Sequence, residues 1–292
     1  MIGTAPRVSH DTATTDDAPA GAVALRLDGI AVRLGGREIL HGIDLRFAAG
    51  EIVGIVGPPG AGKTTIIKTI TGAITPCHGT VYAFGQLLKP GSPRAAQTSG
   101  IAALYQDLAL APNLSPVQNI VLGDEPQTHL FGVVPMIDRQ AAAEEAVRAL
   151  DALGVRLEPS QYHSPVRRLS GGQRQAVAIA RALRTSARLL LMDEPTAALG
   201  HAGRTLLIDI VQRLAAGGVT VIIVSHDIDM LARVAHRLVV VRRGRIRGDD
   251  APTALDLDRL REEMGEERTD APDDHGSAPW YRFDLAGWIR GR

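Results

Sequence analysis

A glycine-rich segment at residues 57–64 carries the residue types needed to hold a triphosphate. It reads Gly57, Pro58, Pro59, Gly60, Ala61, Gly62, Lys63 and Thr64, and Thr65 follows. Glycines let backbone N–H groups approach phosphate oxygens without a Cβ in the way, and a helix beginning at Lys63 would add its positive dipole end. Lys63 would reach the β- and γ-phosphates, and the Thr64 hydroxyl would bind Mg²⁺. The alternative, a glycine-rich turn before a helix, is weakened by the apolar run at residues 52–56 just before it.

Three polar side chains follow later apolar runs, at the positions where strands would end. Asp193 and Glu194 come after residues 189–192, and His226 comes shortly after residues 219–224. Because parallel strands end at one edge of a sheet, the sequence predicts these side chains beside the glycine-rich loop. Asp193 would bind Mg²⁺, and Glu194 would act as general base, polarising a water for attack on the γ-phosphate. The alternatives are two acids that cap the next helix and a structural histidine.

A second helix start, at residues 169–173, has the composition of another anion site. It consists of Leu169, Ser170, Gly171, Gly172 and Gln173. Exposed N–H groups, a hydroxyl donor and the positive end of the helix dipole favour a bound anion there. One triphosphate already has its glycine-rich loop, so this second start is redundant unless it serves the nucleotide of another molecule.

These motifs, in this order and with Gln106 between them, resemble the ATP-binding cassette (ABC) family over about residues 24–248. The resemblance implies an α/β fold of the P-loop NTPase (RecA-like) type. Its parts would be a parallel-sheet core, an antiparallel β subdomain and an inserted helical subdomain. In this family two ATPase subunits dimerise head to tail. Each ATP then lies between the P-loop of one subunit, which here is residues 57–64, and the signature segment of the other, which here is residues 169–173.

The resemblance also divides the chain into three parts. A disordered N-terminal tail would cover residues 1–22, and the ABC ATPase domain would cover residues 23–248. The helical insert of that domain would lie at about residues 107–185. Residues 249–292 would form an acidic linker and an aromatic tail.

Single residues receive roles from the same resemblance. Gln106 would touch Mg²⁺ and the attacking water, and His226 would contact the γ-phosphate as a switch residue. Relatives usually stack an aromatic ring on adenine where this chain has Leu34. The lost stacking, worth about 0.5–1.5 kcal/mol, predicts weaker nucleotide binding. Gly200 stands where the family usually has an aspartate that couples the two ATP sites, so that residue is missing here.

The function implied by the resemblance is that of an ATPase subunit that uses ATP and Mg²⁺ to power solute import. Its partners would be a second ATPase subunit in a homodimer, transmembrane permease subunits and, indirectly, a solute-binding protein, without nucleic acid. It would lie on the cytoplasmic side of the inner membrane, held there by the permease. Residues 106–110, 112–123 and 170–182 are similar to those of monosaccharide importers of the fructose or ribose type. The alternatives are an exporter cassette, an importer of amino acids or other solutes, and a soluble cassette protein outside transport.

Composition agrees with these expectations. The chain has 32 Lys plus Arg and 32 Asp plus Glu, so no net field draws it to nucleic acid or anionic lipid. Cys77 is its single cysteine, which excludes an internal disulfide and fits a reducing compartment. No apolar run reaches the ~18 residues that a membrane span requires, so we expect any membrane role to come through a partner. Residues 1–22 lack the apolar core of a secretory signal and are expected to be disordered.

Apolar patterns predict the elements that must position the site. Strands are expected at residues 25–32, 39–47, 52–56, 80–84, 101–105, 189–192 and 219–224, with a late hairpin around 238–246. Helices are expected after the glycine-rich loop and at residues 139–153, 174–183 and 204–214. Asp138 would cap the second of these helices and Gly154 would end it. Along it, Val147, Leu150 and Leu153 are expected to share a face.

Two features lie outside the resemblance. A basic hairpin, which we interpret as a solvated face, contains Arg242, Arg243, Arg245 and Arg247. The last 13 residues contain Trp280, Tyr281, Phe283 and Trp288. Folding back onto the chain's own domain and docking on a partner or the membrane interface both stay open for this tail.

Overall fold

The computed structural model describes residues 22–130, 133–184, 186–197 and 199–264. The expectations for the N-terminal tail up to residue 21 and for the aromatic C-terminal tail therefore lie outside the described residues. No helix in the described ranges combines the length and the apolar character that a bilayer crossing requires.

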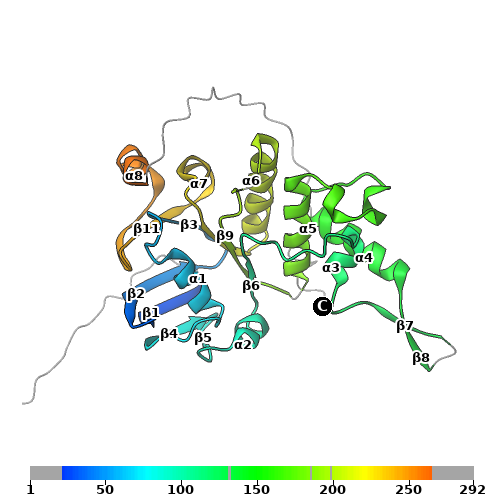
Figure 1. The fold of residues 1–292 in the computed structure, drawn as a ribbon, viewed down its shortest axis with the longest axis horizontal. Helices are drawn as coiled ribbons and strands as arrows, with labels where there is room; N and C mark the ends of the chain where they lie inside the picture. Colours follow the sequence, from blue (N-terminus) through cyan, green and yellow to red (C-terminus); the bar gives the residue numbers. More distant parts are fainter. Residues whose placement is uncertain (1–21, 131–132, 185, 198, 265–292) are drawn as a thin grey trace, which may run out of the picture.

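A six-stranded sheet forms the centre of the molecule (Figure 1). Its order is β12-β11-β3-β10-β9-β6, and all neighbours are parallel except β11 and β12. The strands are β3 (Ile52–Val56), β6 (Ile101–Leu104), β9 (Leu189–Asp193), β10 (Thr220–Val224), β11 (Arg237–Arg242) and β12 (Arg245–Asp250). Every residue of β3, β9 and β10 is buried, which is why these strands are continuous apolar runs. The predicted parallel-sheet core is confirmed.

Alternate residues of the central strands face two separate cores, as the period of a strand requires. In β10, Val221 and Ile223 pack with the helical side of the molecule, whereas Ile222 and Val224 pack with α1 and a second sheet. That second sheet is antiparallel, in the order β2-β1-β4-β5. Its strands are β1 (Val23–Leu34), β2 (Arg37–Ala48), β4 (His78–Ala83) and β5 (Gln86–Leu87). The antiparallel β subdomain is thus confirmed.

The helices cover both faces of the central sheet. On the side of the antiparallel sheet lies α1 (Lys63–Ile70), with α2 (Pro93–Thr98) before β6. On the other side lie α6 (His201–Ala216) and α7 (Ile228–Val234), which contact β10 and β3. A short turn of 3₁₀ helix (Pro252–Ala254) and α8 (Leu257–Met264) follow β12, and Leu260 packs against the same core.

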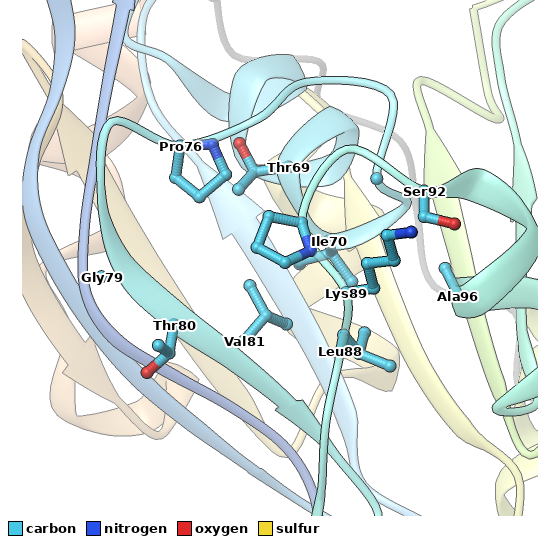
Figure 2. A pocket seen from close by; sticks show the side chains of 12 residues that line it. Thr69, Ile70, Pro76, Gly79, Thr80, Val81, Leu88, Lys89, Ser92 and Ala96 are labelled. Atoms are coloured by element: carbon cyan, nitrogen blue, oxygen red, sulfur yellow. The ribbon is translucent and has the colours of Figure 1, made fainter.

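A crevice between the end of α1 and β4 is shown in Figure 2. Its lining includes Ile70, Val81, Leu88 and Ala96. The cavity has a volume of about 10 Å³, which is room for one water molecule at most. We therefore interpret it as a packing defect between the layers.

A helical subdomain stands to one side of the sheet and contains α3 (Pro116–Val121), α4 (Arg139–Ala152) and α5 (Gly171–Leu183). Two 3₁₀ turns, Gln161–His163 and Val166–Arg168, precede α5. The Asp138 side chain accepts a hydrogen bond of 2.9 Å from the backbone of Ala141, and Gly154 has φ +75° just beyond α4. The predicted beginning and end of this helix are confirmed.

The prediction that Val147 lies on the buried face of α4 is wrong. Leu150 and Leu153 are fully buried, but Val147 is 36% exposed. The buried stripe also contains Ala146 and Ala149. Val147 lies about 100° around the helix from Ala146, which places it at the edge of the stripe.

The region expected to be mostly helical also contains a hairpin. Strands β7 (Gln127–Leu130) and β8 (Val134–Ile137) pair antiparallel and project away from the rest of the molecule (Figure 1). Every residue of β8 is exposed. Four-residue strands without a buried face give no alternation of apolar and polar residues, so the sequence does not indicate them.

Candidate functional site

A cavity of about 660 Å³ lies at the carboxyl edge of the central sheet. It is formed by the loop between β3 and α1, by the residues that follow β9 and β10, and by the hairpin of β1 and β2. Its lining residues are Leu34, Ile39, Gly57, Pro59, Gly60, Ala61, Gly62, Lys63, Thr64, Thr65, Glu194 and His226. Apart from Ile39, all of these were expected from the sequence.

Two glycines of the P-loop are required by close packing as well as by backbone conformation. Gly57 has φ +152°, and a Cβ there would lie 2.0 Å from the carbonyl oxygen of Val241. Gly62 has φ +108°, and a Cβ there would lie 2.7 Å from the side chain of Leu40. No side chain caps α1, which begins directly after Gly62. The N–H groups of its first turn are therefore available to an anion.

Lys63 bonds to its own loop. Its Nζ donates to the carbonyl oxygen of Gly57 at 2.5 Å and to that of Pro58 at 3.2 Å. Burial lowers the pKa of Lys63, while the charges of Glu194 and Asp193 act to raise it. The ammonium group is thus held in the loop, where phosphate oxygens could replace the two carbonyls.

Asp193 is buried at the end of β9, and its Oδ1 accepts a hydrogen bond of 3.4 Å from the Thr64 hydroxyl. Burial raises the pKa of Asp193, and the Thr64 hydrogen bond and the charges of Lys63 and Lys68 oppose this shift. No group of three or more His, Cys, Asp and Glu in the described parts of the chain could hold a metal ion. A paired carboxylate and hydroxyl fit Mg²⁺ instead, since this ion binds through one or two protein oxygens and completes its shell with phosphates and water.

Glu194 and His226 bond to each other across the ends of two strands. The Nδ1 of His226 lies 2.7 Å from Oε2 of Glu194, and the backbone N–H of His226 donates to the same oxygen at 3.4 Å. Glu194 has φ +52°, which costs a non-glycine residue on the order of 1–3 kcal/mol. The surroundings hold this conformation: the Glu194 N–H donates to Val224, and the buried hydroxyls of Thr196 and Ser225 lie 3.3 Å apart.

Gln106 does not line the cavity, although the sequence predicts it there. It is exposed, two residues beyond β6, whose last residue pairs with Met192 next to Asp193. The strand end therefore lies at the correct edge of the sheet, while the side chain is not among those brought together with the P-loop.

The signature segment is also separate from the cavity. Ser170 caps α5: its Oγ accepts from the Gln173 backbone at 3.2 Å, and Gln173 Oε1 accepts from the Ser170 backbone at 3.0 Å. Ser170 is exposed, and Gly172 packs so closely on Gly203 of α6 that a Cβ at Gly172 would lie 3.1 Å from its Cα. The start of α5 therefore lies outside the cavity that the P-loop lines, and the N–H of Gln173 is already bonded to Ser170.

Ile39 is the cavity residue that sequence reasoning missed. It follows the turn between β1 and β2 and lies near Leu34, which is 43% exposed. The alternation of β2 carried the only signal, because it places Ile39 and Leu40 on opposite faces of the strand.

The fold and the site together define a P-loop NTPase. A sequence model of the family described as ABC transporter matches residues 40–197, which is more than half of the chain. This chain belongs to the ABC transporter family.

Relatives with assigned names are similar over most of the chain. It is 39% identical over 245 residues to the arabinose import ATP-binding protein AraG of Azospirillum brasilense, covering 84% of the chain and 46% of the relative. It is 39% identical over 236 residues to the ribose import ATP-binding protein RbsA 2 of Rubrobacter xylanophilus, covering 80% and 44%. The chain thus spans about half the length of the curated relatives it matches.

Solved cassettes have the same fold. An ATP-binding cassette of an ABC transporter in its ADP conformation matches with a TM-score of 0.72 and 25% identity, over 82% of this chain and 98% of that one. A dimeric cassette in a post-hydrolysis state with ADP and Pi matches with a TM-score of 0.63 and 27% identity, over 78% and 98%. These matches confirm the α/β fold expected from the sequence.

Proposed function

We propose that this chain is the ATP-binding and ATP-hydrolysing subunit of an ABC importer whose solute is a monosaccharide. The single observation that carries the proposal is the cavity lined by Lys63, Thr64, Glu194 and His226. Asp193 does not line it, but this buried carboxylate bonds to Thr64, which does. Its volume of about 660 Å³ lies within the range usual for nucleotide-sized ligands.

The residues divide the work of hydrolysis. P-loop N–H groups would bind the phosphates, and Lys63 would exchange the carbonyls of Gly57 and Pro58 for phosphate oxygens. Mg²⁺, held by Thr64 and Asp193, would neutralise charge on the β- and γ-phosphates when bound. Glu194 would accept a proton from the attacking water, and His226 would contact the γ-phosphate.

Completion of the site requires a second copy. Ser170, Gly171, Gly172 and Gln173 would cover the γ-phosphate bound to the partner's P-loop. This arrangement is supported by the separation of the signature segment from the cavity of its own chain, and by the dimeric cassette to which the chain is similar.

A groove of about 450 Å³ runs between β6 and the helical subdomain, next to Gln106. Tyr105 and Leu122, both exposed apolar side chains, lie along it. We assign this groove to a cytoplasmic segment of permease subunits, which would hold the chain at the inner membrane. The names of the relatives, arabinose and ribose import ATP-binding proteins, support sugar import through such a complex.

Co-purification from membranes tests the proposal. We expect the chain to carry a permease and to hydrolyse ATP faster when a sugar-loaded binding protein is added. Arabinose and ribose should be compared with an amino acid under the same conditions. Equal rates with every solute would remove the importer assignment, and no hydrolysis in the assembled complex would remove the ATPase assignment.

A further inference from the structure

The residue that follows His226 carries a charge that is largely buried. Asp227 caps α7, because its Oδ1 accepts a hydrogen bond of 2.9 Å from the backbone N–H of Met230. Its other oxygen, Oδ2, is buried and accepts no hydrogen bond from any residue that the structure describes. The side chain as a whole is only 13% exposed. A buried carboxylate oxygen without a hydrogen bond is unfavourable, so a nearby charge must offset it.

Arg204 supplies the opposite charge from the neighbouring helix. Helices α6 and α7 lie side by side (Figure 1). The Nη1 of Arg204 in α6 lies 3.2 Å from Oδ2 of Asp227, as an ion pair. Arg204 is the fourth residue of α6, where the positive end of the helix dipole disfavours a cation. The electrostatics of α6 alone therefore do not favour an arginine at this position, whereas the buried carboxylate that it faces does.

Both members of this ion pair extend from backbone that is held independently. The N–H of Arg204 donates to the carbonyl oxygen of Gly200 at 3.1 Å, in the first turn of α6. Beyond Asp227, Ile228 and Leu231 anchor α7 because both are fully buried. We therefore expect both helices to keep their places without Arg204, and the short segment before α7 to respond.

That segment determines where the ring of His226 lies. The ring Nδ1 and the backbone N–H of His226 lie 2.7 and 3.4 Å from the same atom, Oε2 of Glu194. The side chain of His226 is otherwise 57% exposed, so packing restrains it little. The direction of the ring thus depends on the backbone at residues 225–227, and Asp227 is the last of these.

We propose that Arg204 is a positioning residue for His226: by offsetting the buried charge of Asp227, it keeps the His226 ring against Glu194 at the cavity. This inference rests on the proposed function, in which His226 contacts the γ-phosphate. Without Arg204, the carboxylate of Asp227 would turn toward water, and the backbone that carries His226 would move with it. Arg204 itself does not line the cavity, so it would affect hydrolysis through His226.

The test is a double-mutant cycle on the full-length chain, assembled with its permease. Arg204→Gln should lower kcat by about 10- to 100-fold, the scale expected for a misplaced group, and should leave KM for ATP within about twofold. Arg204→Lys keeps the charge and should restore most of kcat. Asp227→Asn can still cap α7 but lacks the charge, so it should give a loss similar to that of Arg204→Gln. In a His226→Ala background, Arg204→Gln should have little further effect.

The matched control is another arginine–aspartate ion pair. Arg156 and Asp151 lie 3.4 Å apart in the helical subdomain, and the side chain of Arg156 is 89% exposed. Surface ion pairs of this kind contribute little to stability. Arg156→Gln should therefore leave both kcat and KM for ATP unchanged.

Nitrogen NMR of the histidine rings supplies a readout that does not need activity. In the full chain with isotope-labelled histidine, the signals of His226 are those that disappear in His226→Gln. Glu194→Gln should shift the Nδ1 signal, because it replaces the carboxylate that faces this atom. Arg204→Gln should shift it in the same direction, whereas Arg204→Lys and Arg156→Gln should not shift it.

Two results would overturn the inference. One is an Nδ1 signal in Arg204→Gln that matches the signal of the unchanged chain. The other is a pair of kcat losses, in Arg204→Gln and His226→Ala, that multiply when the changes are combined. An unchanged kcat in His226→Ala would instead contradict the role that the proposed function gives to His226, and the NMR comparison would still test whether Arg204 positions the ring.

Discussion

The P-loop and the start of α5 are both glycine-containing helix starts, yet the structure treats them differently. The P-loop has no cap on its helix, and it lines a cavity together with the carboxylate of Glu194 and the ring of His226. The α5 start is capped twice by its own side chains and is exposed on the surface. The P-loop thus lies beside the candidate catalytic side chains of its own chain, whereas the start of α5 lies outside their cavity.

The difference suggests how binding and hydrolysis would be divided between two chains in the proposed function. In the proposed function, a single chain binds the nucleotide through the P-loop, Lys63 and the Asp193–Thr64 pair. In the same proposal, the γ-phosphate is covered by the signature segment of a second copy, because residues 169–173 do not line the cavity of their own chain. Substitutions on the two sides should therefore separate binding by the single chain from hydrolysis by the dimer.

The largest effect is expected at Glu194. Glu194→Gln should lower kcat by about 10³-fold because it removes the general base, while the phosphate contacts remain. The variant should accumulate as a dimer with ATP and Mg²⁺, measured by gel filtration. Glu158→Gln, at an exposed position outside the cavity, is the control and should behave as the unchanged chain. A Glu194→Gln chain that stays monomeric with saturating ATP would contradict the shared site.

Lys63 tests the half that is complete in one chain. Lys63→Ala should weaken ATP binding by the monomer by roughly 10- to 100-fold, since hydrogen bonds to charged groups are worth about 1.5–3 kcal/mol. Titration with ATP in the absence of dimer measures this loss. Lys89→Ala, which removes an exposed lysine away from the cavity, should bind ATP normally. Unchanged affinity in Lys63→Ala would place the triphosphate elsewhere.

Ser170 tests the other half, and the chain offers a matched control. Ser115 caps α3 with the same reciprocal arrangement, in which Gln118 takes the place of Gln173. Each serine-to-alanine change should cost about 1 kcal/mol of unfolding free energy. Only Ser170→Ala should also lower dimer hydrolysis, by roughly tenfold, without changing ATP binding by the monomer. Equal rates of ATP hydrolysis by the Ser170→Ala and Ser115→Ala chains would contradict a role of the α5 start in hydrolysis.

Leu34 tests where adenine lies when the nucleotide binds to the P-loop. Leu34→Tyr should tighten ATP binding by about 2- to 10-fold, because a ring on adenine adds about 0.5–1.5 kcal/mol of stacking. Leu87→Tyr, at another exposed leucine, serves as the control for surface hydrophobicity. A titration without any change at Leu34→Tyr would show that adenine does not lie against this residue.

The smallest effect is expected in the pH dependence of stability. Burial raises the pKa of Asp193, so this group contributes stability at low pH that is lost as the pH rises through its folded-state pKa. Asp193→Asn should remove this loss. The free energy of unfolding in urea of this variant, relative to that of the unchanged chain, should therefore increase from pH 4 upward. The same variant should lose Mg²⁺-dependent hydrolysis. A stability difference that shrinks as the pH rises would contradict the direction of the shift.

Prediction from sequence succeeded where a motif follows a buried strand. The runs before the P-loop, Asp193 and His226 are apolar on both faces, so strand ends and the site could be located together. It failed for the short exposed hairpin of β7 and β8, which has no buried face to impose a period. Gln106 was expected in the cavity, but it is exposed two residues beyond β6 and does not line the cavity.

The contacts of Arg181 and Arg184 could not be predicted for a different reason. Both arginines donate to backbone carbonyls 60 to 73 residues earlier in the chain, and any residue type can supply a carbonyl. Neither spacing nor composition marks such partners. Only the folded arrangement of α5 against the loop after Gln106 identifies them.

A structure of the Glu194→Gln chain with ATP and Mg²⁺ tests the central claim most directly. We expect two copies, with each triphosphate held by Lys63 of one copy and by Ser170 of the other. A nucleotide-bound form in which Ser170 lies far from every nucleotide would contradict the account.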